Sequence, residues 1–267
     1  MVVTGLVSFA QRAEAGLTEI PYKSAIDGSM QKCWFVAPVM NDKREPSTLV
    51  VYSHGMTTNY QEPFIVGLKQ PMASSVASAH PTFGFLSIGT AYSWANDGVI
   101  QDMTDMIRQA LKQYPVERII LMGTSMGGFT VLNYAEKAPD DIKAKLVGVL
   151  AIYPAGDLGK LYSCTQSPDV RKSLKQILNS TPSPRDLIES RSFFSHIKDM
   201  PDGVKVAVLS AVDDKFVPPK LQRDIVRACK SHKTPVKLIE VPGDHGTMPS
   251  PGRIITGLDF VVYKGMK

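Results

Sequence analysis

The sequence predicts an α/β protein built on a mostly parallel, doubly wound sheet. Three observations indicate this class: short apolar runs rich in Val, Ile and Leu, helical patterns between these runs, and an Asp-Gly turn that joins two extended segments near the N-terminus. Short apolar runs of this kind are typical of strands that are buried on both faces of a parallel sheet. The expected strands are residues 49–53, 83–88, 118–122, 146–153, 204–211 and 236–241.

Helical patterns separate these strands. In residues 98–114 apolar side chains recur every three or four positions and end before Pro115, which predicts a helix with one stripe facing the core. Further helices are expected at residues 126–138 and from Pro218 onward, where Lys230 near the end complements the helix dipole. The alternation of strands with helices predicts the doubly wound arrangement.

Two segments depart from this alternation. Residues 20–25 and 30–38 have extended patterns and are joined by a turn whose Asp27-Gly28 pair favours a hairpin, so the sheet is expected to begin antiparallel. Residues 155–203 carry clustered turn residues and one helical stretch. We interpret them as a small cap inserted into a single domain of residues 1–267, the alternative being a long connection over a sheet edge.

Composition excludes several classes of protein. The 267 residues are 43% hydrophobic and 21% charged, as in globular proteins, and no apolar run is long enough to span a membrane. The net charge of +5 is scattered along the chain, so no nucleic-acid partner is expected. Three cysteines without CxxC spacing, and histidines without metal-ligand spacing, predict no disulfide, metal or other cofactor. With no secretory signal in the first 20 residues, a cytoplasmic location is expected.

The strongest functional motif is the Gly-Thr-Ser-Met-Gly-Gly sequence of residues 123–128, which follows an expected strand and precedes an expected helix. A serine on a sharp strand-to-helix turn needs glycine neighbours because the backbone is strained and other elements approach it closely. The Ser125 hydroxyl would then be exposed at the carboxyl end of the sheet. The N–H of Met126 would lie at a helix N-terminus, where it can stabilise an oxyanion.

This motif and its context resemble the α/β-hydrolase family, in which nucleophile, acid and histidine follow one another along the chain after successive strands. The resemblance extends from the strand at 49–53 to His245. It implies that Ser125 is the nucleophile and that His245, on a glycine-flanked loop after the last strand, is the base. A serine hydroxyl becomes a good nucleophile when an imidazole accepts its proton and a carboxylate orients that imidazole.

Two adjacent carboxylates compete for the position of the acid. The strand at 204–211 runs into Asp213 and Asp214, followed by a Val-Pro pair that resembles the acid loop of the family. The spacing to this pair matches Asp214 better, while Asp213 stays open as an alternative, and Asp244 beside the histidine is a more distant one.

The resemblance also implies an oxyanion loop and a pocket. The His-Gly-Met sequence after the strand at 49–53 lies where the family carries its His-Gly loop, so the N–H of Met56 would be the second oxyanion donor beside that of Met126. His54 is expected to brace this loop without titrating in catalysis. Tyr92 and Trp94 follow a strand end and are candidates for binding the substrate.

These features predict a serine hydrolase that cleaves carboxylic esters of small soluble substrates through an acyl-enzyme. The hairpin, the His-Gly loop and the nucleophile motif also resemble the catalytic domain of prolyl-oligopeptidase-type peptidases, without the propeller that precedes it there. Peptide hydrolysis and acyl transfer to another acceptor would use the same triad and the same oxyanion donors. A non-catalytic protein that binds small ligands on the same scaffold is the alternative from another class.

Overall fold

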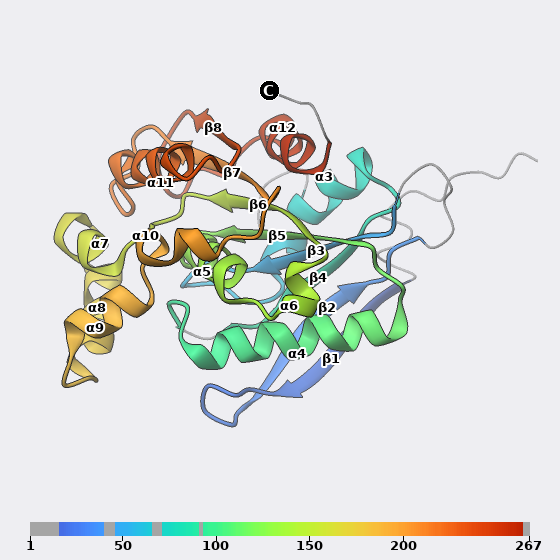
Figure 1. The fold of residues 1–267 in the computed structure, drawn as a ribbon, viewed down its shortest axis with the longest axis horizontal. Coiled ribbons are helices and arrows are strands. Elements are labelled where there is room, and N and C mark those ends of the chain that lie inside the picture. Colours follow the sequence, from blue (N-terminus) through green and yellow to red (C-terminus); the bar gives the residue numbers. More distant parts are fainter. Residues whose placement is uncertain (1–15, 40–45, 66–70, 91–92, 264–267) are drawn as a thin grey trace, which may run out of the picture.

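The computed structural model describes residues 16–39, 46–65, 71–90 and 93–263. These residues form an eight-stranded sheet with helices on both faces (Figure 1). The strand order is β1-β2-β4-β3-β5-β6-β7-β8. The pairs β1–β2 and β2–β4 are antiparallel and the other neighbours are parallel. The predicted mostly parallel sheet with an antiparallel start is therefore confirmed.

All six expected central strands are present, with ends that differ from the prediction by two residues or fewer. The strands of the sheet are β1 (Leu17–Lys23), β2 (Met30–Val36), β3 (Thr48–Ser53), β4 (Gly84–Ile88), β5 (Arg118–Thr124), β6 (Leu146–Ile152), β7 (Lys205–Ala211) and β8 (Val236–Val241). The turn between β1 and β2 is wider than a two-residue hairpin, because Ser24 N–H donates to the Ser29 carbonyl at 2.9 Å. Gly28 takes a φ of 75° in this turn, a value that glycine adopts without steric cost.

Helices cover the sheet on both faces. The three expected helices form as α4 (Asp97–Gln113), α5 (Met126–Lys137) and α11 (Pro219–Ser231). The sequence reasoning did not predict α3 (Met72–Ala79) or α12 (Pro251–Val262), nor the short α2 (Glu62–Ile65) and α6 (Asp140–Lys143). In α12, apolar side chains occur almost all round the helix, so no narrow stripe marked it in the sequence.

The two faces of the sheet belong to two apolar clusters. In β3, Leu49 and Val51 join one cluster, whereas Val50 and Tyr52 join the other. This alternation follows from the two-residue period of a strand. Side chains of α4, α5 and α11 complete the first cluster, and those of α3 and α12 complete the second. Since both faces are covered, β3 is buried at every position and carries the apolar run of residues 49–52.

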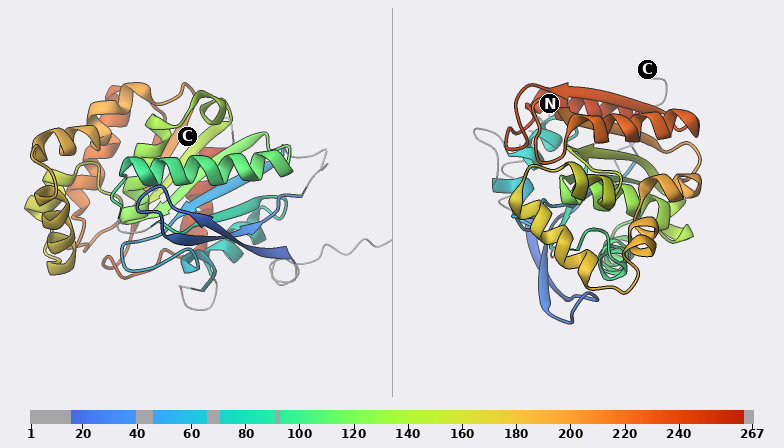
Figure 2. Two further views of the ribbon diagram at one scale, coloured as in Figure 1. Left: turned by 90° about the horizontal axis from the view of Figure 1, so that it is seen from below. Right: turned by 90° about the vertical axis from the view of Figure 1, so that its left-hand side faces the viewer.

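Residues 155–203 fold into short helices that gather at one end of the sheet (Figures 1 and 2). They are α7 (Leu158–Cys164), α8 (Pro168–Asn179), α9 (Pro184–Ser190), α10 (Phe193–His196) and a 3-10 turn, η1 (Ile197–Asp199). A third apolar cluster joins α7 and α8 to Met126 and Phe129 of α5. The segment is therefore packed directly against the helix that follows Ser125.

Candidate active site

Ser125 lies at the sharp turn between β5 and α5, where its φ of 57° and ψ of −114° are strained for a residue with a side chain. The surrounding backbone leaves room for glycine alone. A Cβ atom at Gly127 would collide with the carbonyl oxygen of Ser53, and one at Gly123 would collide with the carbonyl oxygen of Gly127. Gly123 and Gly127 are thus required by the close approach of β3, β5 and α5.

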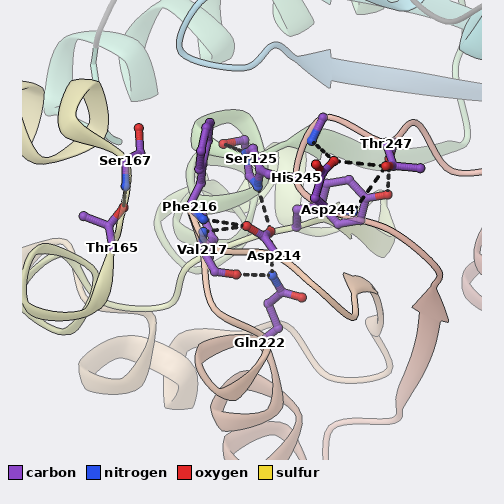
Figure 3. Close-up of polar contacts among 12 residues, drawn as sticks. Ser125, Thr165, Ser167, Asp214, Phe216, Val217, Gln222, Asp244, His245 and Thr247 are labelled. Carbon is purple, nitrogen blue, oxygen red and sulfur yellow. Dashed lines mark hydrogen bonds and ion pairs between the residues drawn. The ribbon is translucent and has the colours of Figure 1, made fainter.

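Ser125, His245 and Asp214 form one continuous hydrogen-bonded chain (Figure 3). The Nε2 atom of His245 lies 2.8 Å from Ser125 Oγ, and its Nδ1 atom lies 2.7 Å from Asp214 Oδ2. These residues come from three loops that each follow a strand of the sheet, as expected for carboxyl ends of parallel strands. In this arrangement the imidazole can accept the serine proton while the carboxylate fixes its tautomer.

The structure distinguishes the two adjacent aspartates. The side chain of Asp214 is fully buried, and its Oδ1 accepts the backbone N–H groups of Phe216 and Val217, each at 2.8 Å. Asp213 is exposed and joins its neighbours through its backbone N–H, which donates to the carbonyl of Gly243. Asp214, the residue that the spacing to Val217 favoured, is thus the one that contacts His245.

Aromatic side chains hold the histidine loop. The Phe216 ring lies 5.2 Å from the His245 ring, and the Tyr153 ring lies 5.7 Å from it. The Tyr153 hydroxyl donates to the carbonyl of Thr247 at 2.6 Å, which ties the loop to the end of β6. Gly243, with a φ of 105°, lets the chain turn before the histidine.

The expected oxyanion loop follows β3. His54 is buried, its Nδ1 donates to the carbonyl of Gly55 at 2.7 Å, and its Nε2 accepts the N–H of Thr90 at 2.9 Å. Both ring nitrogens are therefore occupied by backbone, and burial lowers the pKa of His54, so this imidazole is neutral and braces the loop. Within the described part of the chain, the N–H groups of Met56 and Met126 have no acceptor.

A cavity of about 260 Å³ opens beside Ser125. Besides the serine and histidine it is lined by loop 55–58, by Glu62, Phe216 and Met248, and by residues at the start of α8, including Asp169 and Val170. Among the residues that the structure describes, this lining contains carboxylates but no lysine or arginine. Sequence reasoning missed Glu62, because no helix was expected at residues 62–65 and a single glutamate followed by a proline gave no functional signal.

Trp94 lies away from this cavity. Its side chain is 1% exposed and packs edge-on against Phe129 at 6.1 Å between ring centroids. Its indole N–H donates to Ser173 Oγ of α8 at 3.0 Å. A positive φ at Trp94 and at Ala95 turns this stretch of chain, and the indole supports α8 where we expected a pocket residue. Tyr92, the other expected pocket residue, lies outside the described residues.

No group of three or more His, Cys, Asp or Glu side chains among the described residues has a geometry that would hold a metal ion. The three cysteines are free thiols. None of the helices that the structure describes is both long and apolar enough to span a membrane.

A known protein family matches this chain in sequence, and solved structures are similar to it in fold. The model of the serine aminopeptidase S33 family matches residues 44–180, about half of the chain. The acylaminoacyl peptidase of Pyrococcus horikoshii has a similar structure, with 14% identity, a TM-score of 0.70, and coverage of 94% of this chain and 42% of that one. No curated protein is similar in sequence to this chain at a significant level.

Two structures from Staphylococcus aureus match over nearly their whole length. FphF, a fluorophosphonate-binding serine hydrolase, has 13% identity, a TM-score of 0.72, and coverage of 93% of this chain and 99% of that one. The S-formylglutathione hydrolase FrmB has 12% identity, a TM-score of 0.67, and coverage of 92% and 97%. By contrast, the chain spans less than half of the acylaminoacyl peptidase. At these identities the likeness establishes the fold.

Proposed function

The chain belongs to the serine aminopeptidase S33 family and is a serine hydrolase of the α/β-hydrolase fold, and we propose that it cleaves carboxylic esters of small substrates. In this proposal Ser125 is the nucleophile, His245 the general acid and base, and Asp214 the residue that orients the histidine. The observation that carries the proposal is the unbroken hydrogen-bonded chain from Asp214 Oδ2 to Ser125 Oγ, ending at an open cavity.

The reaction proceeds in two half-reactions. The Ser125 oxygen attacks the ester carbonyl while His245 Nε2 takes the serine proton, and the resulting oxyanion accepts hydrogen bonds from the N–H groups of Met56 and Met126. The tetrahedral intermediate collapses, the alkoxide leaves with the proton from the histidine, and an acyl-enzyme remains. A water then repeats these steps, giving the carboxylic acid and free Ser125. Because Asp214 is buried beneath the imidazole, its charge stabilises the imidazolium that forms in both halves.

The size and charge of the cavity favour an acyl group that is small and either uncharged or cationic. The volume of about 260 Å³ is just below the range of roughly 300–1,000 Å³ for ligand pockets. Glu62 and Asp169 in its lining disfavour an anionic acyl group through like charge. We also propose that residues 155–203 act as a cap, since the start of α8 within this segment forms one wall of the cavity.

A serine aminopeptidase is the second candidate function, because the matched family carries that description. Acyl transfer to an acceptor other than water is a further outcome of the same acyl-enzyme, and product analysis distinguishes it from hydrolysis.

The experiment compares p-nitrophenyl esters from acetate to decanoate with an aminoacyl-proline amide. We expect Ser125-dependent cleavage of the short esters, with a rate that falls once the acyl chain exceeds the cavity. Ser231→Ala, at an exposed serine on α11, is the matched control for Ser125→Ala. Cleavage of the amide at a comparable rate would instead establish the peptidase, and ester cleavage that persists in Ser125→Ala would refute the mechanism.

A further inference from the structure

Glu62 is a buried carboxylate in the wall of the cavity that the mechanism above does not use. It is the first residue of α2 and is 4% exposed. A carboxylate in such a place is destabilised by loss of hydration, and burial raises the pKa of Glu62. Favourable contacts must therefore offset the free-energy cost of burying this carboxylate.

The contacts of Glu62 converge on the loop that follows β3. Its Oε2 atom accepts the backbone N–H of Gly55 at 2.7 Å and the hydroxyl of Thr58 at 2.8 Å. The carbonyl of Gly55 is held in turn by Nδ1 of His54 at 2.7 Å. Glu62 and His54 thus hold the N–H and the carbonyl of the same residue, Gly55, from two sides.

Fixing Gly55 has a direct consequence for Met56. The N–H of Gly55 is taken by the carboxylate, whereas the N–H of Met56, one residue later, has no acceptor among the described residues. A preorganised donor without a ground-state partner is what a developing oxyanion requires, because no bond has to break when the charge forms. We propose that Glu62 is the positioning residue of this oxyanion loop, an inference that rests on the proposed acyl-enzyme chemistry.

A second connection links the loop to the nucleophile. The Tyr52 hydroxyl interacts with the Glu62 carboxylate and lies 2.8 Å from Oγ1 of Thr124, the residue before Ser125. Tyr52, Glu62 and Thr124 are all buried residues. Glu62 therefore ties the loop that carries Met56 to the turn that carries Met126, and so sets the separation of the two donors.

The charge of Glu62 and its geometry have opposite effects on the reaction. A negative charge beside the cavity opposes an oxyanion, whereas the two hydrogen bonds that Oε2 accepts hold the donor in place. Glutamine retains an oxygen that can accept both bonds and removes the charge. Alanine removes both bonds and leaves the buried N–H of Gly55 unpaired.

The experiment measures kcat and KM for p-nitrophenyl acetate in the wild type, Glu62→Ala and Glu62→Gln. We expect Glu62→Ala to lower kcat about 100-fold with little change in KM, because an oxyanion donor acts in the transition state. Glu62→Gln should recover at least tenfold of that loss, since it keeps the acceptor. Glu189→Ala, at an exposed glutamate on α9, is the control for a surface substitution.

The rate at which a fluorophosphonate labels Ser125 is measured in the same variants, so that the result does not depend on the right ester. If the wild type is labelled but cleaves no ester, the proposed substrate is wrong, while the labelling rates still decide the role of Glu62. A wild type that is not labelled overturns both inferences. If Glu62→Ala is unfolded by thermal melting, Thr58→Val, which removes one of the two donors to Oε2, takes its place. The positioning role is overturned if the kcat and the labelling rate of Glu62→Ala stay within about threefold of the wild type. It is also overturned if Glu62→Gln and Glu62→Ala lose equal amounts of activity.

Discussion

Replacing Asp214 with asparagine changes one atom of the site and has a large predicted effect. In the structure, Oδ1 of Asp214 is fixed by the N–H groups of Phe216 and Val217, and Oδ2 faces Nδ1 of His245. The asparagine oxygen would remain on the two N–H donors, because an amide NH₂ cannot accept hydrogen bonds. The NH₂ group would then face His245.

This reversal forces the wrong tautomer on the histidine. With an amide donor opposite, Nδ1 must become the acceptor, so Nε2 carries the hydrogen and cannot take the proton of Ser125. The loss in kcat is about 10⁴-fold for such a change in a serine triad, which corresponds to about 5 kcal/mol of activation free energy. Asp213→Asn is the matched control, because Asp213 is exposed and its backbone N–H makes its bond to Gly243.

The assay compares kcat/KM for p-nitrophenyl acetate in both variants, together with circular dichroism and thermal unfolding. We expect Asp213→Asn to stay within about threefold of the wild type. The reasoning is refuted if Asp214→Asn, properly folded, retains more than about a tenth of wild-type activity, or if Asp213→Asn is the more damaging change.

Three further predictions concern groups outside the triad. Burial raises the pKa of Glu136 from 4.5 to about 10, so the folded state keeps a proton that the unfolded chain releases. The contribution of Glu136 to the free energy of unfolding is therefore fully present below pH 4.5 and is lost as the pH rises toward 10. Urea unfolding at pH 5 and 9 should show this loss, and Glu136→Gln should raise the free energy of unfolding by about 3 kcal/mol at pH 7; equal stability at both pH values would contradict it. Trp94→Phe removes the hydrogen bond to Ser173 of α8 and should lower the free energy of unfolding, measured by urea unfolding, by about 1 kcal/mol. Labelling of Ser125 by a fluorophosphonate should be retained. Tyr153→Phe frees the loop that carries His245 and should lower kcat several-fold in the ester assay, and an unchanged kcat would show that this bond does not position the histidine.

Much of the fold could be predicted because its signals are local. The strands β3, β5 and β6 are buried on both faces, so each appears as a run of consecutive apolar residues, and α4 shows a clear apolar stripe. The helix α12 escaped prediction because it is apolar on most sides, which leaves no periodic contrast. The ends of the six central strands could be placed to within two residues, since polar or turn residues border most of them, whereas β1 begins three residues before its predicted start.

The site was predictable where spacing reflects backbone geometry. Gly127 marks the tight turn around Ser125, and Val217 marks the acid loop because its N–H binds the Asp214 carboxylate. Side-chain direction was not predictable in the same way. Trp94 turns into the protein through a positive φ that its sequence context does not signal, and the contacts of Glu62 with Gly55 and Thr58 depend on the short helix α2, which was not expected.

The most direct test of the account is to detect the acyl-enzyme itself. The protein is mixed with p-nitrophenyl acetate, quenched in acid within milliseconds to seconds, and examined by mass spectrometry of the intact chain and of its peptides. We expect one acetyl group on the peptide that contains Ser125, formed with a stoichiometric burst of p-nitrophenol and absent in Ser125→Ala. Steady ester turnover with the acetyl group on another residue, or an unchanged adduct in Ser125→Ala, would contradict it.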